Sequence, residues 1–206
     1  MKKCLIHLVV LILFQSCTPE GTMRTWSSNE DYDRRFKNVL AMGLVNNVTV
    51  RSDVENELVY AAQKINLKAA NGMSLFPPEL GKPFEDIERV KARLREKGYD
   101  GILTAALIDI RAERYVPPET SYEPLIYYDR FRNYYYRTYD LVYRPGYYSA
   151  SSKYFIETNF YELKEGKLVW SGRSEVFEYG ELESFIPTYS RRLFKELMKE
   201  GVIATQ

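Results

Sequence analysis

The stretch from Tyr99 to Ile110 limits the fold more than any other part of the sequence. Gly101 is followed by nine residues of which only Thr104 and Asp109 are polar. A short apolar run of this kind is typical of a strand at the centre of a sheet. Such a strand has both faces buried, so other elements must pack on both sides of it. The chain has 206 residues, which favours one domain built around this strand.

Further strands and helices are predicted on both sides of this segment. Apolar runs predict strands over 36–45, 68–76, 153–163 and 168–177, the last two joined as a hairpin by the turn 164–167. A capping box of Ser52 and Glu55 predicts the start of a first helix. Apolar residues three and four apart predict the buried stripes of three helices: Val54, Leu58, Ala61 and Ile65; Ile87, Val90 and Leu94; Phe185, Tyr189, Leu193 and Leu197.

The order of these elements predicts the fold class. Strand, helix, strand, helix, strand, insertion, hairpin and helix follow one another along the chain. We therefore expect an α/β (α+β) fold, a single-domain sandwich with three helices packed on a mixed sheet of about five strands. Trp170 is expected to fill the core beneath the last helix.

The amino terminus, MKKCLIHLVVLILFQSC, has the pattern of an export signal. Lys2 and Lys3 precede a ten-residue stretch, Leu5 to Phe14, that is apolar except for His7. This stretch is too short to cross a bilayer as a helix, which takes about 20 residues. A charged start followed by such a run predicts a secretory signal. The alternatives to a lipidated Cys are a plain signal peptide with a chance Cys and an anchor that is never cleaved.

The end of the signal, Phe14-Gln15-Ser16-Cys17, resembles the lipobox of bacterial lipoproteins. The resemblance implies that residues 1–16 are removed and that Cys17 is lipidated. Two or more acyl chains hold a protein stably on a membrane. Residues 17–35 are then the lipidated Cys and a flexible tether, and residues 36–206 the domain. Thr18 stands where many lipoproteins retained in the inner membrane have Asp, so we expect anchoring in the outer membrane, facing the periplasm.

Removal of residues 1–16 leaves few residues for catalysis. It takes away His7 and Cys4, and lipidation uses Cys17, so no His and no free thiol remain. This excludes a Ser-His-Asp triad, a Cys-His pair, a His-ligated zinc and a disulfide. The net charge becomes −1, which argues against nucleic acid as a partner. No phosphate-binding loop motif is present either, and we expect no cofactor or metal.

Asp109 and Glu113 are a candidate carboxylate pair on one strand face, as general acid and base catalysis requires. Acidic residues at a strand end are more often solvated. We therefore expect a protein that is not an enzyme, with an unrecognised envelope hydrolase as an alternative.

The insertion over about 116–152 is rich in tyrosine. Twelve of the 18 Tyr lie between Tyr115 and Tyr154. An insertion of this length is unusual in a compact domain, and three interpretations are open: a structural hairpin, a recognition surface in which Arg lies among rigid aromatic rings, and a membrane-inserting hairpin. The strand parity of Tyr127, Tyr135 and Tyr143 suits the last, but charged residues on the same face oppose it. The residues predicted to bind a partner are Tyr127, Tyr128, Arg130, Arg132, Tyr134, Tyr135, Tyr136, Tyr139 and Tyr143.

The domain resembles bacterial lipoproteins with the fold of the TolB amino-terminal domain, whose relatives by fold include LpoB and CsgG. The residues that carry the resemblance are Lys37 to Val45, Leu94 to Leu103, and the hairpin formed by Glu157 to Leu163 and Gly166 to Ser171. The resemblance implies a lipid-anchored binding or assembly factor with a protein or glycan partner. An oligomeric secretion or pore component is the alternative within the same resemblance, and fold alone does not choose between them.

Overall fold

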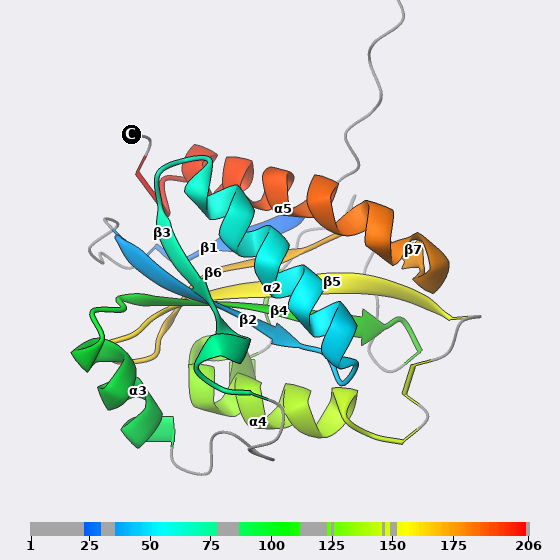
Figure 1. The fold of residues 1–206 in the computed structure, drawn as a ribbon, viewed down its shortest axis with the longest axis horizontal. Helices are drawn as coiled ribbons and strands as arrows, with labels where there is room; N and C mark the ends of the chain where they lie inside the picture. Colours follow the sequence, from blue (N-terminus) through cyan, green and yellow to red (C-terminus); the bar gives the residue numbers. More distant parts are fainter. Residues whose placement is uncertain are drawn as a thin grey trace, which may run out of the picture.

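The computed structural model describes residues 23–29, 36–77, 87–111, 123–124, 126–145, 147–148 and 152–204. These residues form one seven-stranded mixed sheet with helices on both faces (Figure 1). The strand order is β1-β6-β5-β4-β2-β3, and β7 pairs with β5. Strands β3, β2 and β4 run parallel to one another, whereas the pairs β4–β5, β5–β6 and β6–β1 are antiparallel. The predicted class, an α/β sandwich on a mixed sheet, is confirmed.

The strands are β1 (Arg24–Ser27), β2 (Asn38–Leu44), β3 (Lys68–Asn71), β4 (Gly101–Asp109), β5 (Lys153–Glu162), β6 (Leu168–Arg173) and β7 (Phe177–Glu178). The α-helices of the described part are α2 (Val48–Gln63), α3 (Ile87–Glu96), α4 (Phe131–Val142) and α5 (Leu182–Lys199). Three short 3₁₀ turns, η1 (Gly72–Ser74), η3 (Ile126–Asp129) and η4 (Tyr179–Glu181), precede or follow them.

Strand β4 lies at the centre of the sheet, between β2 and β5. All nine of its residues are buried, as the apolar run predicts. Helices α2 and α5 cover one face of the sheet and α3 and α4 the other (Figure 1). Since both faces of β4 are covered, its apolar residues contribute about 1.5–3 kcal/mol per large side chain to the free energy of folding.

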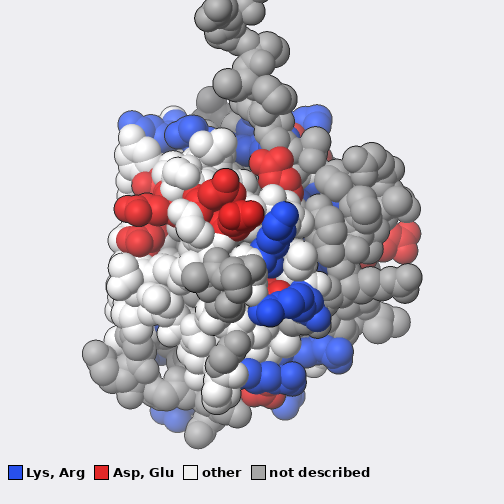
Figure 2. Space-filling view, turned by 90° about the vertical axis from the view of Figure 1, so that its right-hand side faces the viewer, with Lys and Arg blue, Asp and Glu red and all other residues white. Residues whose placement is uncertain are grey.

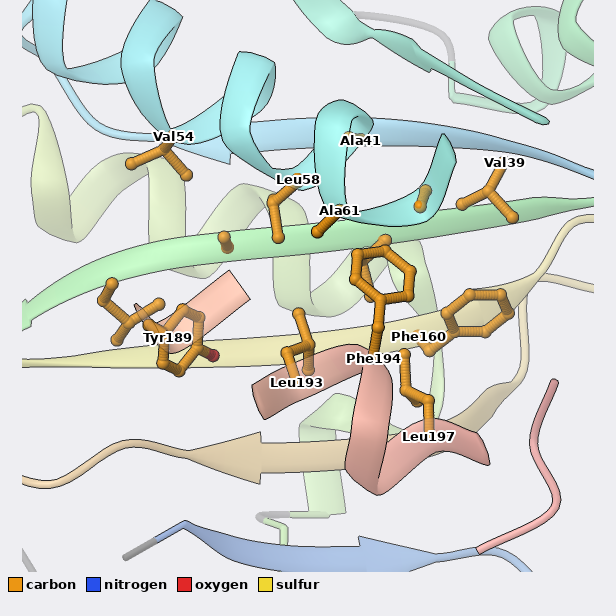
Figure 3. Close-up of a cluster of buried hydrophobic side chains, with 14 of the residues drawn as sticks. Val39, Ala41, Val54, Leu58, Ala61, Phe160, Tyr189, Leu193, Phe194 and Leu197 are labelled. Carbon is orange, nitrogen blue, oxygen red and sulfur yellow. The ribbon is translucent and has the colours of Figure 1, made fainter. Parts of the chain in front are cut away.

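The core between the sheet and helices α2 and α5 is built from the predicted helical stripes (Figure 3). Leu58 from α2 and Leu193 from α5 both belong to this cluster, and each is at most 1% exposed. Phe160 of β5 also belongs to it and packs edge-on against Phe36 with ring centroids 4.6 Å apart. Trp170 belongs to the same cluster and is 0% exposed, so the prediction that it fills the core under the last helix is confirmed.

The described residues form two strands and one helix more than the predicted five strands and three helices. Strand β1 lies inside the range 17–35, which we expected to be a flexible tether; it pairs with β6 through its backbone. Strand β7 has two residues. Backbone pairing of such short segments leaves no apolar pattern in the sequence, so neither strand is predictable from periodicity. The additional helix, α4, lies in the insertion.

The first helix begins one turn earlier than predicted. Asn47 is the N-cap, and its Oδ1 accepts a 3.1 Å hydrogen bond from the backbone N–H of Val50. Ser52 therefore lies within the helix, and Glu55 is 0% exposed. The capping-box prediction is wrong because Asn, an equally good cap residue, precedes it by five residues.

Candidate functional site: the tyrosine-rich helix

In the described part of the tyrosine-rich insertion, the residues 126–145 form a 3₁₀ turn and a helix rather than a hairpin. Helix α4 buries Phe131, Tyr134, Tyr135, Thr138 and Val142. Counted from Phe131, these residues lie at i, i+3, i+4, i+7 and i+11 and so share one side of a helix. Positions 127, 131, 135, 139 and 143 have even spacing, which we interpreted as strand parity, but a spacing of four also suits a helix. The tertiary contacts with the sheet decide between the two periods.

The first half of α4 covers a polar part of the sheet. Tyr128 and Tyr134 pack edge to face with centroids 4.8 Å apart, and Tyr134 lies 6.0 Å from the ring of Tyr161 on β5. Beneath them Arg173 of β6 forms an ion pair with Glu157 of β5, with Nη2 and Oε2 2.6 Å apart. Both charged side chains are at most 5% exposed. Charged groups are buried this fully only when they are paired, so the pair fixes the register of two strands.

Tyr128 connects the helix side to this ion pair. Its hydroxyl accepts a 3.4 Å hydrogen bond from Nη2 of Arg173. Two residues further along each of the two strands, Oγ of Ser171 on β6 donates a hydrogen bond to Oδ1 of Asn159 on β5. Tyr128 and Tyr134 are at most 1% exposed, so both rings belong to the core, and their hydroxyls face the sheet rather than solvent.

The second half of α4 lies against the carboxyl end of β2. Tyr139 and Tyr143 stack with centroids 4.0 Å apart and an interplanar angle of 14°. The hydroxyl of Tyr143 donates a 3.1 Å hydrogen bond to the carbonyl oxygen of Val45. Burial raises the pKa of Tyr143 above its usual value, although Arg51 nearby opposes the shift. Burial, reinforced by the neighbouring Tyr139, also raises the pKa of Tyr135.

Arg51 and Glu55 form a second buried ion pair next to these rings, with Nε and Oε1 2.8 Å apart. The carboxylate also accepts hydrogen bonds from the backbone N–H groups of Gly43, at 2.9 Å, and Met73, at 2.7 Å. Glu55 thereby joins α2 to β2 and η1. A Cβ on Gly72 would lie 3.1 Å from Oε1 of Glu55 and 3.1 Å from the carbonyl oxygen of Ala41, so glycine fits this close approach without displacing either atom.

Two more tyrosines close the carboxyl end of β4. The hydroxyl of Tyr147 accepts a 2.9 Å hydrogen bond from the backbone N–H of Asp109, and that of Tyr148 donates to the carbonyl oxygen of Leu107 at 3.3 Å. Burial raises the pKa of Tyr148 well above its usual value. In open α/β sheets, ligands bind outside the carboxyl ends of adjacent parallel strands whose connections diverge. In this chain Tyr143 lies at the carboxyl end of β2, and Tyr147 and Tyr148 lie at the carboxyl end of β4.

The outward side of α4 carries the remaining predicted residues. Arg132 is exposed, and Tyr136, Tyr139 and Tyr143 are half-buried. These four residues follow one another at spacings of four, three and four, so they form one stripe along the helix, which we name the tyrosine flank. Beside it runs a fully exposed row: Asn133, Arg137, Asp140 and Arg144.

The nine residues predicted to bind a partner therefore separate into groups. Arg132, Tyr136, Tyr139 and Tyr143 form the tyrosine flank, and Arg130, at the N-cap of α4, is half-buried. Tyr128, Tyr134 and Tyr135 are at most 2% exposed and lie in the core. The side chain of Tyr127 lies outside the described residues, as does Cys17.

Asp109, one member of the candidate carboxylate pair, forms an ion pair with Arg111. Burial alone would raise the pKa of Asp109, but hydrogen bonds and the positive charge of Arg111 lower it below its usual value. Glu113 lies outside the described residues, so the pair stays a prediction. Among the described residues, no three acidic, His or Cys side chains gather in a way that would hold a metal ion. None of the described helices is long and apolar enough to span a membrane.

No protein-family model matches the sequence, and no curated protein matches it either. Among solved structures, the chain is similar to the PelC dodecamer from Paraburkholderia phytofirmans, with 11% identity, a TM-score of 0.47 and coverage of 90% of this chain and 99% of that chain. The lipoprotein GNA1162 from Neisseria meningitidis has 10% identity, a TM-score of 0.37 and coverage of 77% and 99%. These similarities are too low to assign a fold family or a function, and the resemblance to the TolB amino-terminal domain stays a prediction.

Sequence reasoning missed the two buried ion pairs. A signal was present for one of them, because Glu157 and Arg173 interrupt otherwise apolar or small-residue strand segments. A charged residue inside a buried strand requires a partner, and the predicted hairpin places the two strands side by side. The Arg51–Glu55 pair has the i,i+4 spacing of an ordinary exposed helix pair, so its burial could not be recognised from spacing.

Proposed function

We propose that this chain is a lipid-anchored protein of the bacterial cell envelope that acts by binding a partner rather than by catalysis. The amino-terminal signal ending at Cys17 supports the anchor, and Thr18 supports the outer membrane, facing the periplasm. The sequence after Cys17 contains neither His nor Cys. This removes the residues most often used as nucleophile and general base, and it supports a binding or assembly role.

The tyrosine flank is the proposed binding surface for a protein or glycan partner. The observation that carries the proposal is the two-sided character of α4. Its inner side is fixed by fully buried rings such as Phe131, whereas Arg132 and Tyr136 on the flank keep solvent access. Tyrosine gives a large amphipathic contact at low entropic cost, and a helix held by its inner side is already in its binding conformation.

Lipidation is tested by metabolic labelling with an alkyne fatty acid. The variant Cys17→Ala is expected to lose the label and to leave the membrane fraction. The matched control is Cys4→Ala, which lies inside the removed signal and is expected to be labelled like the unchanged protein. Label retained in Cys17→Ala would overturn the anchor. The variant Thr18→Asp tests sorting, since it is expected to move the protein from outer to inner membrane in a density gradient.

Partner binding is tested by crosslinked capture from whole envelopes. Deleting the insertion would remove core residues such as Phe131, so point variants are required. The double variant Arg132→Ala, Tyr136→Ala is expected to lose a defined partner while keeping its unfolding transition. The control variant Tyr134→Phe changes a buried ring and is expected to keep the partner. Capture unaffected by the double variant, or capture of copies of the chain alone, would contradict the proposed surface.

A further inference from the structure

The two helical layers of the domain differ in charge. Over residues 87–98 and 129–144, the exposed and half-buried charged side chains are eight basic and four acidic residues. Over residues 47–66 and 175–200, on the opposite face, five are basic and eight acidic. The layer of α3 and α4 is therefore positive and the layer of α2 and α5 negative. The basic residues of the α3 and α4 layer are Arg89, Arg93, Arg95, Lys97, Arg130, Arg132, Arg137 and Arg144.

Figure 2 shows one end of the molecule, where this separation can be followed. Carboxylates gather in the upper half of the view, below a basic rim, and Lys and Arg side chains predominate in the lower half. Three exposed acidic residues lie at or just before the start of α5: Glu178 in β7, Glu181 in η4 and Glu183 in α5 itself. A charge distribution of this kind attracts an anionic partner to one layer and repels it from the other.

Aromatic rings lie within the basic layer. On the tyrosine flank, Arg132 is followed after one turn by Tyr136, and the exposed row beside the flank carries Arg137 and Arg144 two turns apart. The Arg guanidinium binds a carboxylate through two parallel hydrogen bonds, which a compact ammonium group cannot do. All eight basic residues of the layer except Lys97 are Arg. The surface thus combines carboxylate-binding forks with amphipathic rings.

We infer that the partner of the tyrosine flank is a carboxylate-bearing polysaccharide. This inference rests on the proposed function, because it names the partner class of the same surface. The Arg side chains bind the carboxylates of the sugar acid units, and the solvent-accessible parts of the half-buried tyrosine rings pack on the apolar faces of the sugar rings. A neutral glycan would not match the positive charge of the layer, and a polymer of phosphate would not pack on the tyrosine rings.

The charge part of the inference is tested with the full-length lipidated protein in detergent. Binding is measured against alginate, a polyuronate, and against neutral dextran. The variant Arg132→Glu, Arg137→Glu is expected to bind alginate about tenfold more weakly, since two solvent-exposed Arg–carboxylate contacts are lost and each is individually weak. The control variant Arg191→Glu, Lys195→Glu makes the same change in net charge on α5 and is expected to bind as the unchanged protein does.

The contribution of the tyrosine rings to binding is tested at Tyr136. Inorganic polyphosphate serves as the comparison, because it is an anionic polymer without sugar rings. Tyr136→Ala is expected to weaken alginate binding about fivefold and to leave polyphosphate binding unchanged, while Tyr136→Phe keeps both. Equal binding of alginate and polyphosphate, unaffected by Tyr136→Ala, would overturn the inference in favour of unspecific charge attraction. Absence of alginate binding would overturn it as well.

A third experiment measures binding of the same protein to vesicles that contain an anionic phospholipid. Binding to vesicles but not to alginate, lost in Arg132→Glu, Arg137→Glu, would show that the basic layer faces the bilayer and would overturn the inference. The failure of the proposed function is read separately: if crosslinked capture from envelopes depends on the tyrosine flank but alginate does not bind, the proposed function stands and the acidic polysaccharide is excluded.

Discussion

Nε1 of Trp170 donates a 2.9 Å hydrogen bond to Oε2 of Glu200, the residue that follows α5. The other carboxylate oxygen accepts a hydrogen bond from Oγ1 of Thr25 on β1. One carboxylate thus joins the end of the last helix to β6 and to the edge strand β1. Because Trp170 is 0% exposed, its N–H depends on this acceptor.

Loss of that acceptor is expected to destabilise the domain. Glu200→Ala leaves a buried indole N–H without its partner, which costs about 1–3 kcal/mol of the free energy of unfolding. Tryptophan fluorescence during urea unfolding measures the change. Glu196→Ala, one turn earlier, removes only the ion pair with the exposed Lys199 and is expected to cost less than about 0.5 kcal/mol. Equal stability of Glu200→Ala and the unchanged protein would contradict the role of Glu200.

The sequence predicted those parts of the fold in which burial follows a regular period. Leu58 and Leu193 each belong to an apolar stripe at helical spacing, and the segment from Gly101 to Ile110 is apolar except for Thr104 and Asp109. Helices α2 and α5 and the central strand could therefore be placed. The site was harder to predict because its residues satisfy two periods at once. Tyr135 and Tyr139 are four apart, which suits a strand face and a helix face equally, and only the contacts of Tyr134 with Tyr161 of β5 select the helix.

The buried carboxylate of Glu55 is expected to be among the most sensitive positions. Glu55→Ala removes an acceptor shared by Arg51, Gly43 and Met73 and leaves the Arg51 charge buried, which costs about 3–5 kcal/mol. Chemical unfolding followed by circular dichroism measures this. Glu57→Ala, two residues later on the same helix and half-buried, is the control. A loss in Glu55→Ala no larger than that of the control would show that the carboxylate does not hold α2, β2 and η1 together.

Gly172 on β6 is expected not to accept a side chain, because the indole ring of Trp170 fills the space next to it. A Cβ there would lie 2.3 Å from Cη2 of Trp170, so Gly172→Ala must displace the indole and is expected to cost about 1–3 kcal/mol or more. At Gly180 nothing lies within 4 Å of such a Cβ, and Gly180→Ala is expected to be near neutral. Thermal unfolding of the two variants side by side gives the comparison, and similar melting temperatures would refute the packing argument.

The Asp109–Arg111 ion pair predicts an acid-dependent loss of stability. The pKa of Asp109 is lower in the folded protein than its usual value, so the folded state favours the charged carboxylate. The contribution is therefore complete above about pH 3.9, the unfolded value, and is lost as the pH falls through the folded pKa. Asp109→Asn is expected to be less stable than the unchanged protein at neutral pH and to approach it in acid. Urea unfolding of both proteins over a pH series checks this, and a difference independent of pH would contradict it.

The buried tyrosines predict a loss of stability in alkali. Burial raises the pKa of Tyr135, Tyr143 and Tyr148 above the usual value of about 10. Because the folded pKa exceeds the unfolded one, the stabilisation is complete below about pH 10 and is lost as the pH rises towards the folded pKa. The absorbance of phenolate is expected to rise in two stages, the second together with the loss of circular dichroism. Tyr148→Phe is expected to reduce that second stage by one phenol. Ionisation of every tyrosine in a single stage, with the helical signal intact, would show that these phenols reach solvent in the folded protein.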